Sequence, residues 1–301
     1  MKNDVQRDFA TYPRNFNTYK WFKPLLVGLL FFVFYFLFAS LIYLNTSLVF
    51  HTNISFSGYD TLDFYSAAGA FFNCGMEAIY IPSMLLAALI LKDRPFSSYL
   101  SSIGGWRWKT FLMTCAAAFV IVGIPTAVHL LLSGNTGDVR FTSGGLILLV
   151  LLMPLLCIAE ELFYRGYVMQ TVSSWFKLMI AGMVVQTIAF MAIHPYNLNG
   201  LIHIAVSAVI YGLVCVYTKG IEASSSLHIM SNLIQLILSG FGYGRLTAEQ
   251  SLTGPMFNAA LKVLFLVFII YAYKKLHWFD EVQFDDIEPF NEKHAPKKKA
   301  S

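Results

Sequence analysis

Charged side chains are scarce in this sequence of 301 residues, in which Asp, Glu, Lys and Arg together make up 13%. Ordinary soluble domains carry about 25% charged residues, so the scarcity excludes a water-soluble globule. Hydrophobic residues make up 57%, and the mean hydropathy is +0.61. The apolar runs also lack the alternating polarity of a transmembrane β-barrel. We therefore predict an all-α, polytopic integral membrane protein.

Cysteine is also rare, and the net charge of +4 is small. The four cysteines, Cys74, Cys115, Cys157 and Cys215, lie in or beside apolar runs without a CxxC pair, so we expect small buried hydrophobic side chains. Basic residues stand at the ends of apolar runs rather than in one cluster. This pattern gives no indication of a nucleic-acid partner and points to a lipid bilayer.

Eight apolar runs approach the length that crosses a hydrocarbon layer of about 30 Å. We predict transmembrane helices at 25–44, 66–91, 111–132, 146–173, 178–194, 201–217, 224–239 and 257–273. The first run is too long for a signal-peptide core and has no cleavage site after it, so we expect it to remain as a helix. Pro82 is expected to kink the second helix, and the fourth carries polar residues within its length.

Lys and Arg concentrate in alternate connections, which predicts that both termini are cytoplasmic. The tail after Trp278 is polar and ends in KKKAS, so we expect a solvated end that touches anionic lipid. The predicted organisation is a cytoplasmic segment at 1–24, accessory helices at 25–144, a core at 145–240, an eighth helix at 241–278 and a tail at 279–301.

Several polar side chains fall inside these apolar runs, where an ionised group costs several kcal/mol. They are Glu160, Glu161, Arg165, His194, His228 and Asn232. Helical spacing puts Glu161 beside Arg165 and turns Glu160 about 100° away, so that Glu160 is left to face a cavity. His228 and Asn232 are also four residues apart and share a face. We expect the carboxylate and the imidazoles to meet at one wet pocket.

The strings EELFYRG, FMAIH and HIMSN resemble, in this order, the three motifs of the CPBP intramembrane proteases. This is the Abi or CAAX-protease family, typified by Rce1-type prenyl-protein endopeptidases. Its patterns EExxxR, FxxxH and HxxxN fall on Glu160, Glu161 and Arg165, on Phe190 and His194, and on His228 and Asn232. The resemblance covers roughly residues 145 to 240, and three ordered motifs on successive helices are a specific signal.

The resemblance implies an intramembrane endopeptidase that cleaves a membrane-associated protein or peptide. Glu160 would activate water with the help of His194, and His228 and Asn232 would stabilise the oxyanion. Arg165 and Phe190 would support these groups, and Glu161 stays in the catalytic set because the motif does not decide which glutamate is the base. The bacterial form of the motifs suggests a bacterial plasma membrane.

Zinc is an open alternative, because Glu160, His194 and His228 could supply a His₂Glu ligand set. No HExxH motif occurs, and we favour a mechanism that requires no cofactor. Two other functions could use the same polar cavity, namely a secondary transporter and a non-catalytic bacteriocin self-immunity protein.

Four further polar residues lie in apolar runs without a motif partner. We expect Glu77 to make a structural polar contact, with a place in the cavity wall as the alternative. His129 and His203 should make contacts between helices, and Lys262 should extend along its helix to the interface.

Overall fold

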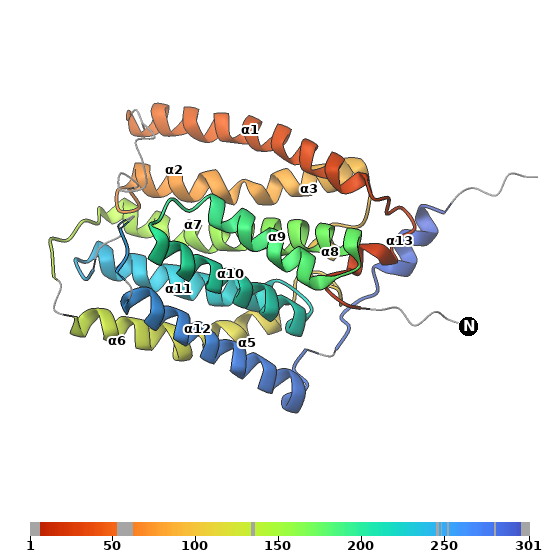
Figure 1. Cartoon of the computed structure of the whole chain (residues 1–301). Coiled ribbons are helices and arrows are strands. Elements are labelled where there is room, and N and C mark those ends of the chain that lie inside the picture. The colour runs from red at the N-terminus through yellow and green to blue at the C-terminus, as the bar shows by residue number, and fades with distance from the viewer. Residues whose placement is uncertain are drawn as a thin grey trace, which may run out of the picture.

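The computed structural model describes residues 7–52, 63–133, 136–244, 247, 249–251, 253–279 and 281–295. Within these ranges the chain is helical, and its extended segments pair only in isolated bridges, Ser101 with Gly220 and Thr136 with Tyr243. Figure 1 shows the long helices lying side by side in one bundle. The prediction of an all-α protein is confirmed.

A helix occupies each of the eight predicted positions. The long elements are α1 (Lys23–Phe50), α2 (Ala67–Ala78) with α3 (Tyr80–Leu91), α5 (Trp108–Ala118) with η3 (Phe119–Gly123) and α6 (Ile124–Leu132), α7 (Ser143–Glu161) with η4 (Leu162–Met169) and α8 (Gln170–Phe176), α9 (Met179–Ala192), α10 (Leu198–Thr218), α11 (Glu222–Gly240), and α12 (Thr253–Tyr271) with η5 (Ala272–Leu276). The short elements are η1 (Tyr12–Asn15), α4 (Ser97–Leu100) and α13 (Ile287–Lys293).

The described residues contain six helical stretches that are long and apolar enough to cross a membrane, so the predicted count of eight crossings is not confirmed. The helix α9 has 14 residues and extends about 21 Å, which is shorter than the hydrocarbon layer. The helix α11 has 19 residues, but serines and other polar residues lower its hydropathy. Most of α11 is buried, so its polar side chains face other helices rather than lipid.

Four of the membrane helices depart from regular α-helical geometry, two of them through the π-helical segments η3 and η5. The second predicted helix is interrupted at Ile79, between α2 and α3, as expected from Pro82, which cannot donate a hydrogen bond to the Ala78 carbonyl. The fourth continues without a turn from Ser143 to Phe176, but its middle part, η4, is a π-helix. This π-helical segment directly follows Glu160 and Glu161.

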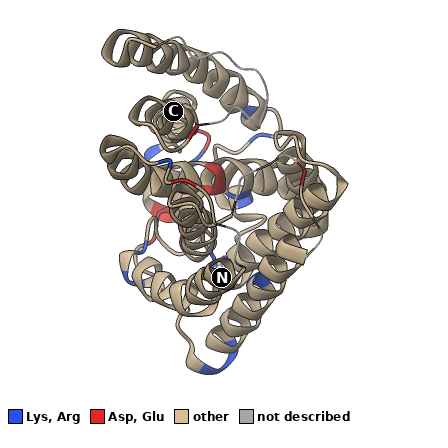
Figure 2. Ribbon diagram, turned by 90° about the vertical axis from the view of Figure 1, so that its left-hand side faces the viewer, with Lys and Arg blue, Asp and Glu red and all other residues tan. Residues whose placement is uncertain are grey.

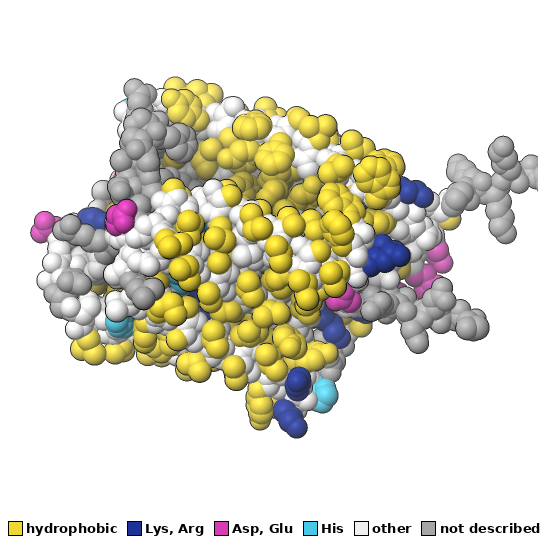
Figure 3. Space-filling view, viewed as in Figure 1, with side chains coloured by type: hydrophobic (Ala, Val, Ile, Leu, Met, Phe, Trp, Pro, Cys, Tyr) yellow, Lys and Arg dark blue, Asp and Glu magenta, His cyan; other side chains and the backbone are white. Residues whose placement is uncertain are grey.

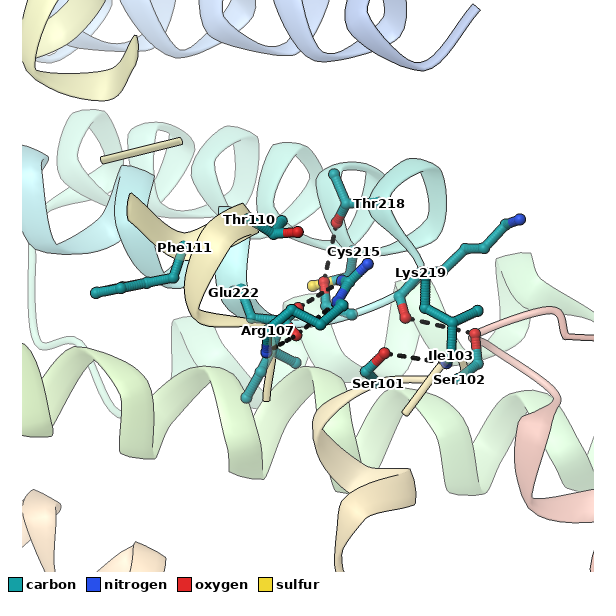
Figure 4. A network of polar contacts seen from close by, with 12 residues as sticks. Ser101, Ser102, Ile103, Arg107, Thr110, Phe111, Cys215, Thr218, Lys219 and Glu222 are labelled. Atoms are coloured by element: carbon teal, nitrogen blue, oxygen red, sulfur yellow. Dashed lines mark hydrogen bonds and ion pairs between the residues drawn. The ribbon is translucent and has the colours of Figure 1, made fainter. Parts of the chain in front are cut away.

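A buried ion pair fixes the start of α11 (Figure 4). The guanidinium of Arg107 donates from Nε and Nη2 to the Glu222 carboxylate at 2.8 and 2.6 Å, and the Arg107 backbone N–H donates at 3.0 Å. The bridge between Ser101 and Gly220 lies beside this pair. The connection that precedes α5 is therefore bound to the helix that carries His228 and Asn232.

The surface agrees with a membrane protein. Figure 3 shows apolar side chains over the middle of the bundle, with Lys and Arg gathered mainly at the end where α1 begins. Figure 2, which looks along the bundle, shows acidic positions on helices in its interior. An apolar belt with a cationic end is the pattern expected of a polytopic membrane protein.

Both described ends of the chain pack together at the cationic end of the bundle (Figure 1). Arg7 pairs with Asp285 at 3.1 Å, the Tyr12 hydroxyl donates to Asp286 at 2.5 Å, and the ring of Phe16 contacts that of Phe290. The tail was expected to be a solvated end, and most of its described residues are exposed, although α13 packs on the N-terminal segment. The lysines of KKKAS lie outside the described residues.

Candidate active site

The first part of the site is an ion pair within one helix turn. Glu161, the last residue of α7, accepts from Arg165 Nη1 at 3.0 Å, and both side chains are fully buried. The contact predicted from their spacing is confirmed. The Arg165 guanidinium also donates to the Ala208 carbonyl of α10 and lies 4.6 Å from the centre of the Phe190 ring. The Phe190 ring therefore packs against the Arg165 guanidinium.

His228 of α11 bridges the two adjacent glutamates. Its Nδ1 lies 3.0 Å from Glu161 Oε1, and its Nε2 lies 3.3 Å from Glu160 Oε2. Contacts thus run in series from Arg165 through Glu161 and His228 to Glu160. The ring of Tyr211 stacks on the imidazole at 4.8 Å between centroids. Because Arg165 neutralises only Glu161, the two glutamates have different electrostatic surroundings.

The local geometry of η4 is not apparent in the sequence. A π-helical turn adds a residue to the hydrogen-bonded ring, and such turns are frequent at functional sites. Here η4 begins at Leu162 and continues to Met169, so it contains Arg165 and follows the glutamates directly. The run does contain Pro154 before η4 and Gly166 within it, but these residue types indicate a kink or a close helix contact and do not by themselves predict a π-helical turn.

His194 lies two residues beyond the end of α9 rather than within the helix. Its Nδ1 is 2.7 Å from the Phe190 carbonyl oxygen, a contact in which Nδ1–H donates and Nε2 is left as the acceptor nitrogen. In the described part of the chain, no carboxylate lies within 4 Å of its ring nitrogens. The structure places His194 in the cavity wall but not in contact with Glu160.

A cavity of about 760 Å³ joins these groups. Glu160, His194, His228 and Asn232 all line it, so the pocket expected from the sequence is present. Among the residues that the structure describes, the Asn232 amide makes only a weak 3.8 Å contact with the sulfur of Cys157. This amide is therefore close to the catalytic candidates without a strong partner of its own.

The cavity continues from the buried glutamates to the end of the bundle opposite the described termini. Its lining there includes Ser133 after α6, Tyr196 before α10, and Gln250 and Ser251 before α12. Ser251 is exposed. The catalytic candidates are thus connected to that end of the bundle.

Two cavity residues lie outside the three motifs. Glu77 of α2 lines the cavity together with Glu160, so the alternative considered for it, a place in the cavity wall, is the one that the structure shows. The prediction for Lys262 was wrong, because its side chain is 3% exposed and points into the cavity instead of reaching the interface. In the sequence, the feature that marks both Glu77 and Lys262 is a single acidic or basic residue within an apolar run.

Of the other two membrane histidines, His203 makes the predicted hydrogen bond between helices, and His129 makes a ring contact between helices. His129 of α6 stacks on Phe257 of α12 at 4.5 Å between ring centroids. His203 of α10 lies 3.3 Å from Asn258 of α12 through Nε2 and the amide oxygen.

The three candidate zinc ligands do not form a metal site in this arrangement. Among the described residues, no three His, Cys, Asp or Glu side chains converge on a point where they could hold an ion. Glu160 and His228 contact each other directly, and His194 stands apart from both.

Fold and site together define a polytopic helical membrane protein with a buried carboxylate and imidazole site in an internal cavity. Residues 142–234 match the family model described as type II CAAX prenyl endopeptidase Rce1-like. The match begins just before α7, ends within α11 and contains all three motifs, so the predicted relationship to the CAAX-protease family is confirmed for this segment. Comparisons with curated proteins and with solved structures gave no match.

Proposed function

We propose that this protein is a CAAX-type intramembrane endopeptidase and that the cavity beside Glu160 is its active site. The observation that carries the proposal is the unequal environment of the two glutamates. Arg165 neutralises Glu161, whereas Glu160 faces the cavity and contacts His228. A carboxylate placed in this way is suited to accept a proton from water.

Glu160 is assigned the role of general base. It takes one proton from a water molecule, whose oxygen attacks the peptide carbonyl, and the same proton then passes to the departing amine as the C–N bond breaks. His228, oriented by Glu161, holds the Glu160 carboxylate in position. The arrangement of Glu161, His228 and Glu160 is similar to a catalytic triad in one respect, because a buried carboxylate orients an imidazole.

The Asn232 amide is assigned to the oxyanion, because it lines the cavity without a strong competing partner. A donor of this kind contributes about 3 kcal/mol to transition-state stabilisation. His228 could add a second donor only after its contact with Glu160 is released. His194, with Nε2 as an acceptor, is assigned to the attacking water.

The experiment that tests the proposal is cleavage by the purified protein in detergent micelles. The substrate is a peptide ending in S-farnesyl Cys-Val-Ile-Ser, and mass spectrometry detects the new terminus. We expect Glu160→Gln to lower kcat at least about 100-fold, as for loss of a general base. Glu288→Gln, on the exposed face of α13, is the matched control and should leave kcat unchanged. Full activity of folded Glu160→Gln would refute the assignment.

We also propose that the Lys- and Arg-rich end of the bundle, with both termini, faces the cytoplasm. Short loops rich in these residues are retained on that side of a membrane.

A further inference from the structure

A second pocket, of about 510 Å³, lies at the cationic end of the bundle and shares no lining residue with the cavity beside Glu160. Its wall consists of Arg7 and Asp8 of the N-terminal segment, Val216, Tyr217 and Lys219 at the end of α10, and Tyr273 of η5. The helix α10 and the stretch α12–η5 are both long and apolar enough to cross the membrane, and both end here. The pocket is therefore at the depth of the lipid head groups.

The fully buried Ser102 holds the two cationic residues of this pocket beside each other. Its N–H donates to the Lys219 carbonyl at 2.9 Å, and its hydroxyl donates to the Arg7 carbonyl at 3.0 Å. The Ser102 carbonyl in turn accepts from Arg7 Nη1 at 3.1 Å. Figure 4 shows the Lys219 side chain extending away from Ser102, so the backbone is bound there while the ammonium is directed elsewhere. Two cations from distant parts of the chain are thus fixed at one place.

The acidic groups beside these cations do not cancel their charge fully. The Asp8 carboxylate accepts two hydrogen bonds from the residue that precedes η1, at 3.1 and 2.7 Å. Asp285 pairs with Arg7 Nη2 at 3.1 Å, but its side chain is 42% exposed, so water weakens this pair. A guanidinium has five N–H donors, and among the described residues Ser102 and Asp285 each accept one from Arg7. Arg7 therefore keeps donors for an anion in the pocket, beside the ammonium of Lys219.

The rest of the wall suits a lipid better than a free ion. The rings of Tyr217 and Tyr273 contact each other with centroids 5.8 Å apart, and tyrosine is typical of the membrane interface. Apolar side chains continue from the pocket toward the middle of the bundle. On α10, the exposed Val209 precedes Val216 by two helical turns and shares its face. On α12, the half-buried Leu266 precedes Tyr273 by about two turns. An anion in the pocket would thus lie next to an apolar surface that acyl chains can cover.

We propose that this pocket binds the phosphodiester head group of an anionic phospholipid, in the leaflet on the side of the termini, with the phosphate between Arg7 and Lys219. The planar guanidinium can donate to two phosphate oxygens at once, and the ammonium adds a compact charge. Lys274 and Lys275, both exposed, directly follow Tyr273 and favour an anionic over a zwitterionic lipid. The inference is independent of the proposed endopeptidase function.

Lipid binding to the purified, delipidated full chain tests the proposal. Native mass spectrometry from non-ionic detergent micelles measures the apparent Kd for dioleoylphosphatidylglycerol and for dioleoylglycerol, which has the same acyl chains and no phosphate. The phospholipid should bind at least about 10-fold more tightly, as expected for charge-assisted hydrogen bonds to the phosphate. Equal affinity for the two lipids would overturn the proposal.

Substitution assigns the effect to the pocket. Lys219→Gln removes the ammonium but keeps the backbone carbonyl that binds Ser102, and it should weaken phosphatidylglycerol binding about 5–10-fold while leaving dioleoylglycerol unchanged. Arg7→Gln should cause a similar loss. Lys177→Gln is the matched control, because Lys177 also follows a helix at the cationic end, with φ of 55° against 60° for Lys219, but lies outside the pocket. Its binding should equal that of the unmodified protein. Equal loss for Lys219→Gln and Lys177→Gln would show diffuse attraction to a cationic surface and overturn the assignment.

Two further ligands distinguish the source and the charge of the bound group. Inorganic phosphate in excess should leave phosphatidylglycerol bound, because it lacks the acyl chains. Complete displacement by inorganic phosphate would assign the pocket to a soluble phosphate and overturn the lipid assignment. Dioleoylphosphatidylethanolamine, which is zwitterionic, should bind more weakly than phosphatidylglycerol, and equal affinity would overturn the preference for an anionic lipid.

Discussion

The buried pair of Arg107 and Glu222 should be one of the strongest single anchors of α11. The two side chains are 1% and 0% exposed, and the carboxylate accepts three hydrogen bonds from Arg107. Removing one partner of a buried ion pair leaves the other charge unpaired and costs about 3–5 kcal/mol. We expect this loss for Arg107→Met and for Glu222→Met.

The corresponding change in melting temperature follows from the length of the chain. Unfolding entropy near 2.1 cal/mol/K per residue gives about 0.6 kcal/mol/K for the whole protein, so each single variant should melt about 5–8 °C lower. The assay is thermal unfolding in detergent micelles, followed by tryptophan fluorescence.

The double variant Arg107→Met, Glu222→Met provides the decisive comparison. With both charges removed, no buried charge is left unpaired, so its loss should be much smaller than the sum of the two single losses. Additive losses would refute the argument that the pair acts as one unit. The variant Gly220→Ala disturbs the same ion pair without changing either charged residue, because the added methyl group would overlap Arg107 Nη2 and the Glu222 carboxylate.

Two further predictions concern stability. Burial raises the pKa of the Asp93 carboxyl above its ordinary 3.8, against the opposing effects of Arg94 and the Tyr99 hydroxyl. The folded protein therefore holds this proton more tightly than the unfolded chain, and the contribution to stability is full below about pH 4 and is lost as pH rises. Asp93→Asn should thus gain in melting temperature relative to the unmodified protein between about pH 4 and pH 8, and a constant difference would contradict this. Gly182→Ala should lower the melting temperature by about 2–5 °C, because the methyl group would overlap the Met169 carbonyl, whereas Gly254→Ala, which meets nothing within 4 Å, should not.

Local periodicity was sufficient to predict part of the site. Glu161 and Arg165 pair because four residues make about one helical turn, which is a property of the sequence alone. The motif spacing likewise placed Asn232 and His228 on one face, and both line the cavity.

Contacts that depend on packing between distant helices could not be predicted. His228 reaches both glutamates because α11 lies against α7, and spacing along either helix does not contain this information. The interfacial position expected for Lys262 was wrong for a similar reason, since hydropathy gives the length of an apolar run but not which side of it faces protein. The polar composition of α11 also shows that a helix surrounded by protein need not be apolar enough to face lipid.

The position of the cavity opening determines from which side of the membrane a polypeptide could enter. The cavity reaches the exposed Ser251 at the end of the bundle away from the termini. With the termini in the cytoplasm, as proposed above, this opening would face the extracytoplasmic compartment. Polypeptide substrates of the proposed endopeptidase would then have to be exported, or to enter from the outer leaflet, which would separate the proposed activity from newly made cytosolic chains.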